Sequence, residues 1–426
     1  MANAASTSSI LYNTAALDAA DARAWTSSRL SRVAMPASDA FQRYWEAARH
    51  PERSGDMYGT VDTYQTFSPC PVDVFDTVKI VLIRKEYEAA WRDLESSFIA
   101  GRKTFDPEEV ATRYEGHPTP TPVAPYPRAY TITGSPGIGK TLFLAFSLLR
   151  CLERHWTVVL QTNPSLLYIF NSCGVWKVRV EDMDMVGSWY ALPKATWCLL
   201  DSNDALTSVP QLTIDLGFFI TQAALPEARR TSWQTKTRMI TSDYVMRPMS
   251  VEEAQLAFSL SRVLDIGRTE ETDRVIRNVF DKYGPDTRLA SRAAIHGEKW
   301  ENDPAARLDG FLARLSTTNV LDALHGSARL ERLIRLARDL YLGARLLRTD
   351  PKLLRMGARI LSTDVRLFHL ARLSRMDDDI AAAYAILVVL PGKTRSRARV
   401  DFVSPYVRGR CLEAFPGLDL SDIEGA

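Results

Sequence analysis

The chain has 426 residues, of which 53 are lysine or arginine and 51 are aspartate or glutamate, so its formal net charge is +2. This near-neutral balance gives no general electrostatic argument for binding nucleic acid or a membrane surface. Its five cysteines are scattered and lack C-x-x-C spacing, which argues against a disulfide framework or a zinc site and indicates a reducing compartment.

No apolar run approaches the roughly 20 residues that a membrane-spanning helix needs, so we predict no membrane association. Residues 1–34 are rich in alanine, serine and threonine and lack the charged and apolar regions of a secretory signal. We predict that they form a disordered N-terminal tail. The chain is accordingly expected to be intracellular, in the cytoplasm or the nucleus.

Residues 35–117 predict a small α+β region. Aromatic residues on one side of Ser38–Arg49 indicate a helix, whereas the glycines within Arg53–Cys70 indicate a loop. The apolar, β-branched stretch Thr77–Arg84 is typical of a strand. Apolar residues then recur at helical spacing over Lys85–Ile99, which predicts an amphipathic helix.

Proline dominates residues 118–128, and a run with so few amide groups is typical of an extended linker. Over residues 129–268, β-prone stretches alternate with helix-prone ones, which predicts a parallel sheet flanked by helices. Ser250 and Glu253 have the spacing of a capping box at the start of one such helix. The expected strands are Ala129–Thr133, Trp156–Gln161, Leu166–Phe170, Val175–Val180, Trp197–Asp201, Phe218–Ala224 and Met239–Met246.

Residues 269–426 predict a mainly helical region, because strand signals mostly stop there. Between Arg329 and Arg375 basic residues outnumber acidic ones and alternate with leucines. This pattern is typical of a solvated helix face, and the alternative is a surface for nucleic acid or an acidic partner. The expected helices are Glu270–Tyr283, Asp309–Leu315, Ala328–Arg348 and Pro351–Arg375, and the basic face includes Arg332, Arg335 and Arg338.

The sequence from Gly134 to Thr141 matches G-x-x-x-x-G-K-[ST], the pattern of a phosphate-binding P-loop. The glycines let the backbone approach an anion closely, and the amide groups at the start of the following helix attract negative charge. Lys140 is expected to contact the β- and γ-phosphates, and the alternative interpretation is a glycine-rich turn without a ligand. The residues expected to hold the phosphates are Gly134, Ser135, Pro136, Gly137, Ile138, Gly139, Lys140, Thr141 and Leu142.

Asp201 ends an apolar stretch and is the natural candidate for the Walker B acid, which helps to hold Mg²⁺. With the hydroxyl of Thr141 it is expected to bind the metal that accompanies ATP. The alternative for Asp201 is a turn residue that caps the end of the strand. Many ATPases place a catalytic glutamate directly after this aspartate, but this chain has Ser202 there. Asp204 is either its replacement or an ordinary loop acid.

Three further polar residues are candidates for contact with the terminal phosphate. Gln222 lies near the end of the next expected strand, where it is either a sensor of the phosphate and the attacking water or a satisfied polar residue. Arg229 is either an arginine finger or part of a solvated basic turn. Arg288 follows a Gly-Pro turn that either folds the helical region toward the nucleotide or simply connects two regions.

These motifs, in this order, resemble the NTPase module of Crinkler-type proteins and retrotransposon hot spot proteins. The resemblance covers roughly residues 75–410, implies an AAA-like or STAND-like ATPase, and leaves a role as a secreted effector open. Met249 stands where tryptophan is usual in the family, and Thr287 stands where proline is usual. The stretches that carry the resemblance are Val81–Tyr87, Ile132–Leu144, Leu199–Ser202, Met246–Glu253, Gly284–Arg288 and Val403–Val407.

We therefore expect an α/β fold, a P-loop NTPase with a parallel sheet flanked by helices, between the small α+β N-terminal region and the mainly helical C-terminal region. The expected ligand is a nucleoside triphosphate with Mg²⁺, and the expected activity is slow ATP hydrolysis that acts as a conformational switch. The alternatives are a scaffold that binds the nucleotide without hydrolysing it and a nucleic-acid-associated module. A homo-oligomer or a protein partner would suit an arginine finger that acts from a neighbouring subunit.

Overall fold

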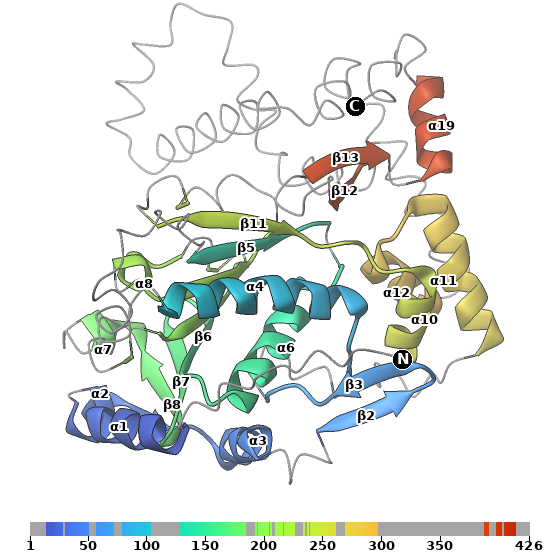
Figure 1. Cartoon of the computed structure of the whole chain (residues 1–426). Helices are drawn as coiled ribbons and strands as arrows, with labels where there is room; N and C mark the ends of the chain where they lie inside the picture. The colour runs from blue at the N-terminus through green and yellow to red at the C-terminus, as the bar shows by residue number, and fades with distance from the viewer. Residues whose placement is uncertain are drawn as a thin grey trace, which may run out of the picture. The chain divides into compact units, whose positions relative to one another are not determined.

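The protein is described by a computed structural model, drawn as a ribbon in Figure 1. Its contacts divide the chain into two compact units. The first contains Met1–Thr131, Thr141–Ala223 and Trp233–Ser242, and the second contains Ile132–Lys140, Ala224–Ser232 and Asp243–Ala426. The residues that the structure describes are 14–28, 30–50, 57–71, 79–103, 128–135, 137–184, 192–193, 195–203, 205–206, 209–215, 217–225, 233–234, 237, 239–260, 269–296, 387–391, 398–402 and 404–414.

An eight-stranded sheet is the largest element of the fold. Neighbouring strands β6, β9 and β10 pair in parallel, with Trp197 of β9 opposite both Val158 and Phe219. At the other end of the sheet, β6, β7, β8 and β1 pair antiparallel. In spatial order the strands are β1 (Met35–Pro36), β8 (Gly174–Arg179), β7 (Leu166–Asn171), β6 (Val158–Asn163), β9 (Trp197–Asp201), β10 (Phe219–Ala223), β5 (Ala129–Thr133) and β11 (Thr241–Val245).

Strand β5 continues the parallel arrangement on the other side of β10. The amide of Ile220 donates to the carbonyl of Arg128, and four residues further along both strands the amide of Ala224 donates to the carbonyl of Ile132. Bonds that advance in the same direction on both strands are those of a parallel pair. The sheet was predicted as parallel and flanked by helices, and this is confirmed for β6, β9, β10 and β5. The predicted hairpin of β7 and β8 is also present.

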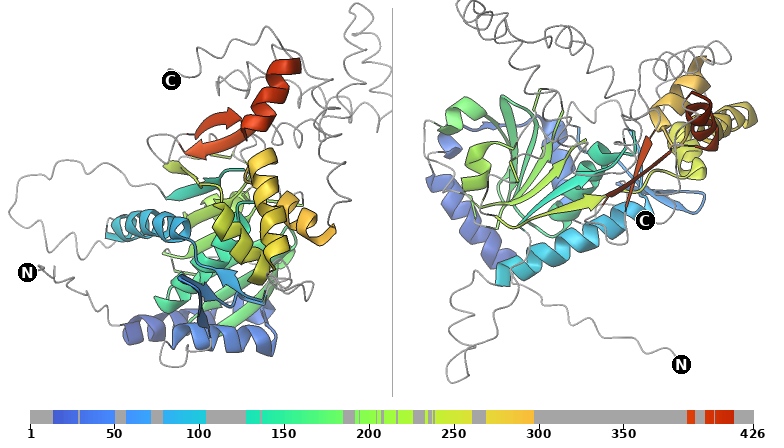
Figure 2. Two further views of the ribbon diagram at one scale, coloured as in Figure 1. Left: turned by 90° about the vertical axis from the view of Figure 1, so that its right-hand side faces the viewer. Right: turned by 90° about the horizontal axis from the view of Figure 1, so that it is seen from above.

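Helix α6 (Lys140–Glu153) and helix α4 (Lys85–Lys103) lie on one face of this sheet, and the three views of Figures 1 and 2 agree on this. Within the first unit, Trp197 on this face stacks on Trp91 of α4 with ring centroids 5.1 Å apart and on Trp156 at 5.4 Å. Such aromatic contacts add to the burial of large apolar surfaces. The aromatic residues of α4 therefore belong to the core.

The other face of the sheet is covered in part by residues that we predicted to be disordered. Helices α1 (Thr14–Ser27) and α2 (Leu30–Val33) place Trp25 and Leu30 in the core, with exposed fractions of 2% and 0%. The ring of Trp25 lies 5.3 Å from that of Trp176, and β1 then pairs with β8. The predicted disordered tail, residues 1–34, is therefore wrong for residues 14–28 and 30–34. Its alanine-rich composition concealed two large apolar anchors.

Trp25→Ala is expected to lower the free energy of unfolding by about 3–5 kcal/mol, because it removes a buried indole and leaves a cavity. Thermal and denaturant unfolding of the purified chain would measure this change. Arg23→Ala is the matched control, because Arg23 is exposed on the same helix. Equal stability of the two variants would contradict the packing of α1 against the sheet.

The stretch Arg53–Cys70, predicted as a loop, contains a β-hairpin instead. Strand β2 (Tyr58–Val61) pairs antiparallel with β3 (Tyr64–Phe67), and β3 pairs with the short strand β4 (Val81–Leu82). The prediction followed the glycines and overlooked the β-branched and aromatic residues around the turn, where Asp62 has φ +53°. The strand predicted over Thr77–Arg84 is reduced to β4 within the described residues.

In the second unit, helices α10 (Val251–Leu260), α11 (Glu270–Tyr283) and α12 (Thr287–His296) share one hydrophobic cluster. The predicted capping box is confirmed, since Ser250 Oγ accepts from the amide of Glu253 at 3.2 Å and the Glu253 carboxylate accepts from the amide of Ser250 at 3.1 Å. The buried members of the cluster are Ala254, Phe258, Ile276, Val279, Tyr283, Ala290 and Ala293.

The C-terminal region is not uniformly helical. Strands β12 (Leu387–Pro391) and β13 (Ala398–Phe402) form an antiparallel pair that was not predicted, and helix α19 (Pro405–Ala414) follows. The hydroxyl of Ser404, just before α19, donates to the carbonyl of Lys282 on α11 at 2.6 Å. The helices predicted over Asp309–Leu315, Ala328–Arg348 and Pro351–Arg375 lie outside the described residues.

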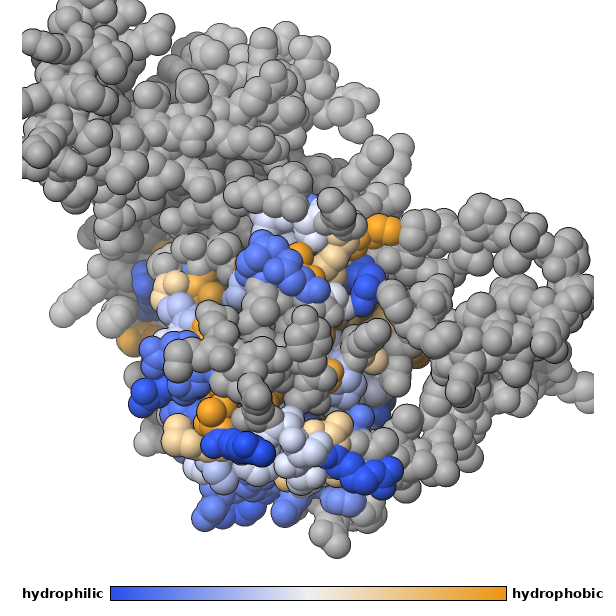
Figure 3. All heavy atoms as spheres, turned by 90° about the vertical axis from the view of Figure 1, so that its left-hand side faces the viewer, coloured by the Kyte–Doolittle hydropathy of each residue, from blue (hydrophilic) through white to orange (hydrophobic). Residues whose placement is uncertain are grey.

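Hydrophilic side chains cover much of the described surface in Figure 3, where hydrophobic ones appear only in small groups. None of the described helices is long and apolar enough to cross a lipid bilayer. The five cysteines are free thiols in the structure, and four of them, Cys70, Cys151, Cys198 and Cys411, are buried. Three further helices of the first unit, α3 (Asp39–Arg49), α7 (Val180–Asp184) and α8 (Gln211–Asp215), complete its described elements.

Candidate functional site

The predicted P-loop lies between strand β5, which ends at Thr133, and helix α6, which begins at Lys140. Gly134 and Gly137 have φ angles of +137° and +77°, values that other residues rarely adopt. A Cβ atom on Gly134 would lie 2.9 Å from the carbonyl oxygen of Met246. The loop therefore requires glycine here for both its conformation and its close packing.

The geometry of the loop suits an anion. Its backbone turns through the glycine positions and leads directly into the N-terminus of the 14-residue helix α6. Amide groups at a helix N-terminus, together with the helix dipole, form a site for a phosphate. The structure therefore brings together the strand, loop and helix that phosphate binding requires.

Lys140 lies along this loop. Its Nζ donates to the carbonyl oxygens of Gly134 at 2.9 Å and Ser135 at 2.8 Å, and only 9% of the residue is exposed. These contacts hold the ammonium group against the concave backbone of the loop. A phosphate in the loop would offer the same group stronger, charge-assisted acceptors.

Thr141 and Asp201 meet within the first unit. The hydroxyl of Thr141, at the start of α6, donates to Asp201 Oδ1 at 2.9 Å, and Asp201 ends β9 with 6% of its surface exposed. A hydroxyl and a carboxylate are hard oxygen ligands, and Mg²⁺ commonly takes one or two such groups while substrate phosphates and water complete its shell. The donor set therefore fits Mg²⁺. The described residues contain no group of three or more His, Cys, Asp or Glu side chains that would hold another metal.

The position after Asp201 offers no base. Ser202 is 8% exposed, and its hydroxyl donates to the carbonyl of Leu206 at 3.0 Å. A serine hydroxyl held in this way does not replace a glutamate that aligns a water molecule. Asp204 lies outside the described residues.

Gln222 does not lie where it was expected. In the parallel register of β9 and β10, Gln222 is opposite Leu200, whereas Ala223 is opposite Asp201. Because side chains alternate between the two faces of a sheet, Gln222 and Asp201 point to opposite faces. The oxygen Oε1 of Gln222 accepts from Trp233 Nε1 at 2.7 Å. The expected role at the phosphate is corrected to that of a buried, satisfied polar residue.

Within the second unit, helix α12 contacts the P-loop. The hydroxyl of Thr287 donates to the carbonyl of Gly137, and a Cβ on Gly137 would lie 3.0 Å from Thr287 Oγ1 and 3.4 Å from Cγ of Arg288. Arg288 thus lies next to Gly137 in the second unit, and its role at a phosphate stays a prediction. The contact by Thr287 was missed, because threonine was noted only as a departure from the family pattern.

The remaining predicted ligands take different positions. Ile138 is fully buried, so only its backbone faces the loop, and Ser135 is 8% exposed. Gly139 and Leu142 are half-buried at the start of the helix. Pro136 and Arg229 lie outside the described residues.

No family model matches the chain, and no curated protein matches it. Among solved structures, a RuvB variant from Thermotoga maritima is similar, at 15% identity over 76% of this chain and 93% of that chain, with a TM-score of 0.31. We draw no argument from a likeness of this size. The interpretation of the site depends on the residues and contacts described above.

Proposed function

We propose that the chain is a P-loop NTPase module that binds Mg-ATP and hydrolyses it slowly as a conformational switch, like the Crinkler-type and retrotransposon hot spot modules that it resembles. The contact of Thr141 with Asp201, 2.9 Å long, carries the proposal. It joins the last residue of the P-loop to a buried acid at the end of a central strand. A glycine-rich turn without a ligand has no need of this pair.

Each residue then has a defined task. The glycine-rich loop binds the phosphates through its amides, and Lys140 neutralises charge on the β- and γ-phosphates. Thr141 and Asp201 hold Mg²⁺, which when bound stabilises the charge that develops on the phosphates during hydrolysis. Turnover is slow because Ser202, held by Leu206, supplies no carboxylate to align water.

The switch is supported by Thr287. A nucleotide in the loop changes the environment of Gly137, whose carbonyl accepts from Thr287 at the start of α12. Helix α12 packs with α10 and α11 in one hydrophobic cluster, so the three helices respond together. Arg288, beside the loop, is placed to add a positive charge near the phosphates.

The proposal is tested by isothermal titration of the full chain with ATP and with GTP, with Mg²⁺ and with EDTA, followed by a phosphate-release assay. We expect ATP to bind at least tenfold more tightly with Mg²⁺. Thr141→Val keeps the side-chain shape and removes the hydroxyl, so it is expected to abolish most of this gain. Thr26→Val, at an exposed site, is the matched control. Absence of ATP and GTP binding to the wild-type chain would refute the proposal.

Ser202 also favours a second candidate, a module that binds nucleotide stably and uses it to hold a protein partner or a second copy of the chain. ATP affinity without multiple turnover would support this candidate. The third candidate, nucleic-acid binding, depends on Arg332, Arg335 and Arg338, which lie outside the described residues, and it stays a prediction from the sequence.

A further inference from the structure

A pocket of about 310 Å³ lies at the C-terminal end of α6, the end opposite the P-loop. The face of hairpin β2–β3 that carries Tyr58, Thr60 and Gln65 forms one wall, since Thr60 pairs with Gln65 across the hairpin and Tyr58 lies two residues before Thr60. The last turns of α6 form the other wall. The lining residues are Tyr58, Gly59, Thr60, Gln65, Arg150 and Glu153.

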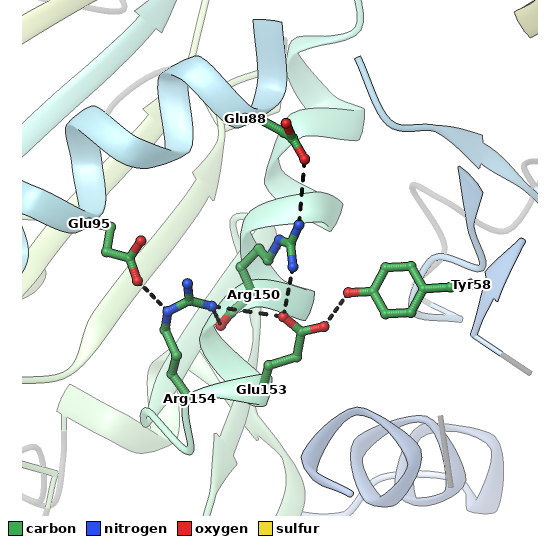
Figure 4. Close-up of polar contacts among 6 residues, drawn as sticks. All are labelled: Tyr58, Glu88, Glu95, Arg150, Glu153 and Arg154. Carbon is green, nitrogen blue, oxygen red and sulfur yellow. Dashed lines mark hydrogen bonds and ion pairs between the residues drawn. The ribbon is translucent and has the colours of Figure 1, made fainter. Parts of the chain in front are cut away.

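Glu153, which lines the pocket, accepts from neighbouring donors in the network of polar contacts that Figure 4 shows. Its carboxylate accepts from the hydroxyl of Tyr58 and from Arg150 Nη1 at 3.2 Å. Burial, and secondly the hydrogen bond to Glu153, raise the pKa of Tyr58 above its ordinary value, so this hydroxyl stays a donor. A carboxylate has about four acceptor positions, and therefore Glu153 has capacity for another donor.

The charged residues that line the pocket are Arg150 and Glu153, and the ion pairs that extend from them to α4 contain more acidic than basic side chains. Arg150 lies 3.8 Å from Glu88, and Arg154 pairs with Glu95 and lies 3.8 Å from Glu153. Three carboxylates thus face two guanidinium groups. The C-terminus of α6 adds the negative end of a helix dipole, and an acid in a final helical turn is electrostatically unfavourable there. A cationic group from outside would relieve this excess.

Strand β2 adds backbone groups beside the pocket. It is an outer strand of its sheet, and no strand in the described part of the chain pairs with its other edge. The two-residue turn makes Val61 and Tyr64 the hydrogen-bonded closing pair, so the alternation of an antiparallel ladder directs the backbone groups of Tyr58 and Thr60 outward. None of the residues from Tyr58 to Val61 is charged or a proline, the residue types that usually protect such an edge.

We propose that β2 and this pocket together form a docking site for an extended peptide segment that carries a lysine or arginine side chain. The peptide backbone pairs with the outer edge of β2, as in other cases of strand addition. The basic side chain enters the pocket and binds Glu153. The site is independent of the P-loop, so its occupancy does not depend on the proposed nucleotide function.

The probe is a fluorescein-labelled peptide, Thr-Val-Thr-Lys-Thr-Val-Thr, with blocked ends, titrated with the full chain and followed by fluorescence anisotropy. The matched peptide has norleucine in place of lysine, which keeps the length of the side chain and removes its charge. We expect the lysine peptide to bind about tenfold or more tightly than the norleucine peptide. Equal binding of the two, or no binding, would overturn the proposal.

Two variants separate the parts of the site. Glu153→Gln keeps an oxygen that accepts from Tyr58, and it is expected to weaken the lysine peptide about tenfold while leaving the norleucine peptide unchanged. Thr60→Pro removes an outward amide without removing a bond to β3, and it is expected to weaken both peptides. Glu181→Gln, at an exposed acid, is the control that leaves both unchanged.

A second measurement uses the wild-type chain, so its result does not depend on whether a variant folds. Hydrogen exchange of the wild-type chain is expected to show that the lysine peptide protects the amides of Tyr58 and Thr60. Protection of other amides instead of these two would place the peptide off the strand edge and overturn the proposal.

Discussion

Lys140→Ala is expected to lower the affinity of the chain for Mg-ATP about 100- to 1,000-fold. The ammonium group lies against the loop that leads into α6, where its Nζ contacts the carbonyl groups of Gly134 and Ser135. Hydrogen bonds between charged groups contribute about 1.5–3 kcal/mol each, and a lysine that reaches two phosphate groups makes at least two of them. Isothermal titration of the variant and the wild type, at one Mg²⁺ concentration, measures this difference.

Lys85→Ala is the matched control for this prediction. Lys85 is exposed at the start of α4, so its removal takes away the same charge from the molecule at a site without a loop. If both variants bind ATP as the wild type does, the P-loop is not the site that binds the phosphates. Thermal unfolding of the Lys140 variant separates lost affinity from lost structure.

Asp201→Asn is expected to reduce the rate of ATP hydrolysis about 100-fold or more, because it removes the negative charge that holds Mg²⁺ and so weakens the stabilisation of the transition state. The amide of asparagine still offers an oxygen to the hydroxyl of Thr141, so the contact of 2.9 Å between α6 and β9 has a replacement. The variant therefore removes the negative charge of Asp201 and keeps the contact with Thr141. Phosphate release over a range of Mg²⁺ concentrations measures the rate of ATP hydrolysis by the variant and the wild type.

The Mg²⁺ titration makes this test specific. The variant is expected to need a higher Mg²⁺ concentration for half-maximal activity, which a general loss of structure would not produce. Asp215→Asn, at the exposed end of α8, is the control. Unchanged activity at every Mg²⁺ concentration would remove Asp201 from the metal site.

Local patterns were sufficient to predict the parts of the site that are adjacent in the chain. The spacing from Gly134 to Thr141 predicted the loop and a helix after it, and the β-prone stretch before it predicted β5 at its observed bounds. The capping box of Ser250 and Glu253 was equally local. These features depend on contacts between residues a few positions apart, which the sequence displays directly.

Where prediction failed, the deciding contacts were distant in the chain. Gln222 lay near the end of the expected strand, but only the pairing of β9 with β10 shows that it faces away from Asp201. Trp25 lies in an alanine-rich stretch, and only its packing on Trp176 makes that stretch part of the core. A shift of strand register by one residue turns a side chain to the other face of the sheet. One aromatic contact with a distant residue likewise decides whether a side chain belongs to the core.

The sequence by itself determined the glycine-rich pattern from Gly134 to Thr141, which predicts a P-loop, and made Asp201 the candidate acid for its metal. Loop conformation and strand propensity depend on neighbouring residues, so the local sequence is sufficient to predict these features. Only the tertiary structure decided that Thr141 meets Asp201, that Thr287 contacts Gly137 and that Glu153 lies below the edge of β2. Each of these contacts joins residues far apart in the chain, because packing and register, rather than local propensity, bring them together.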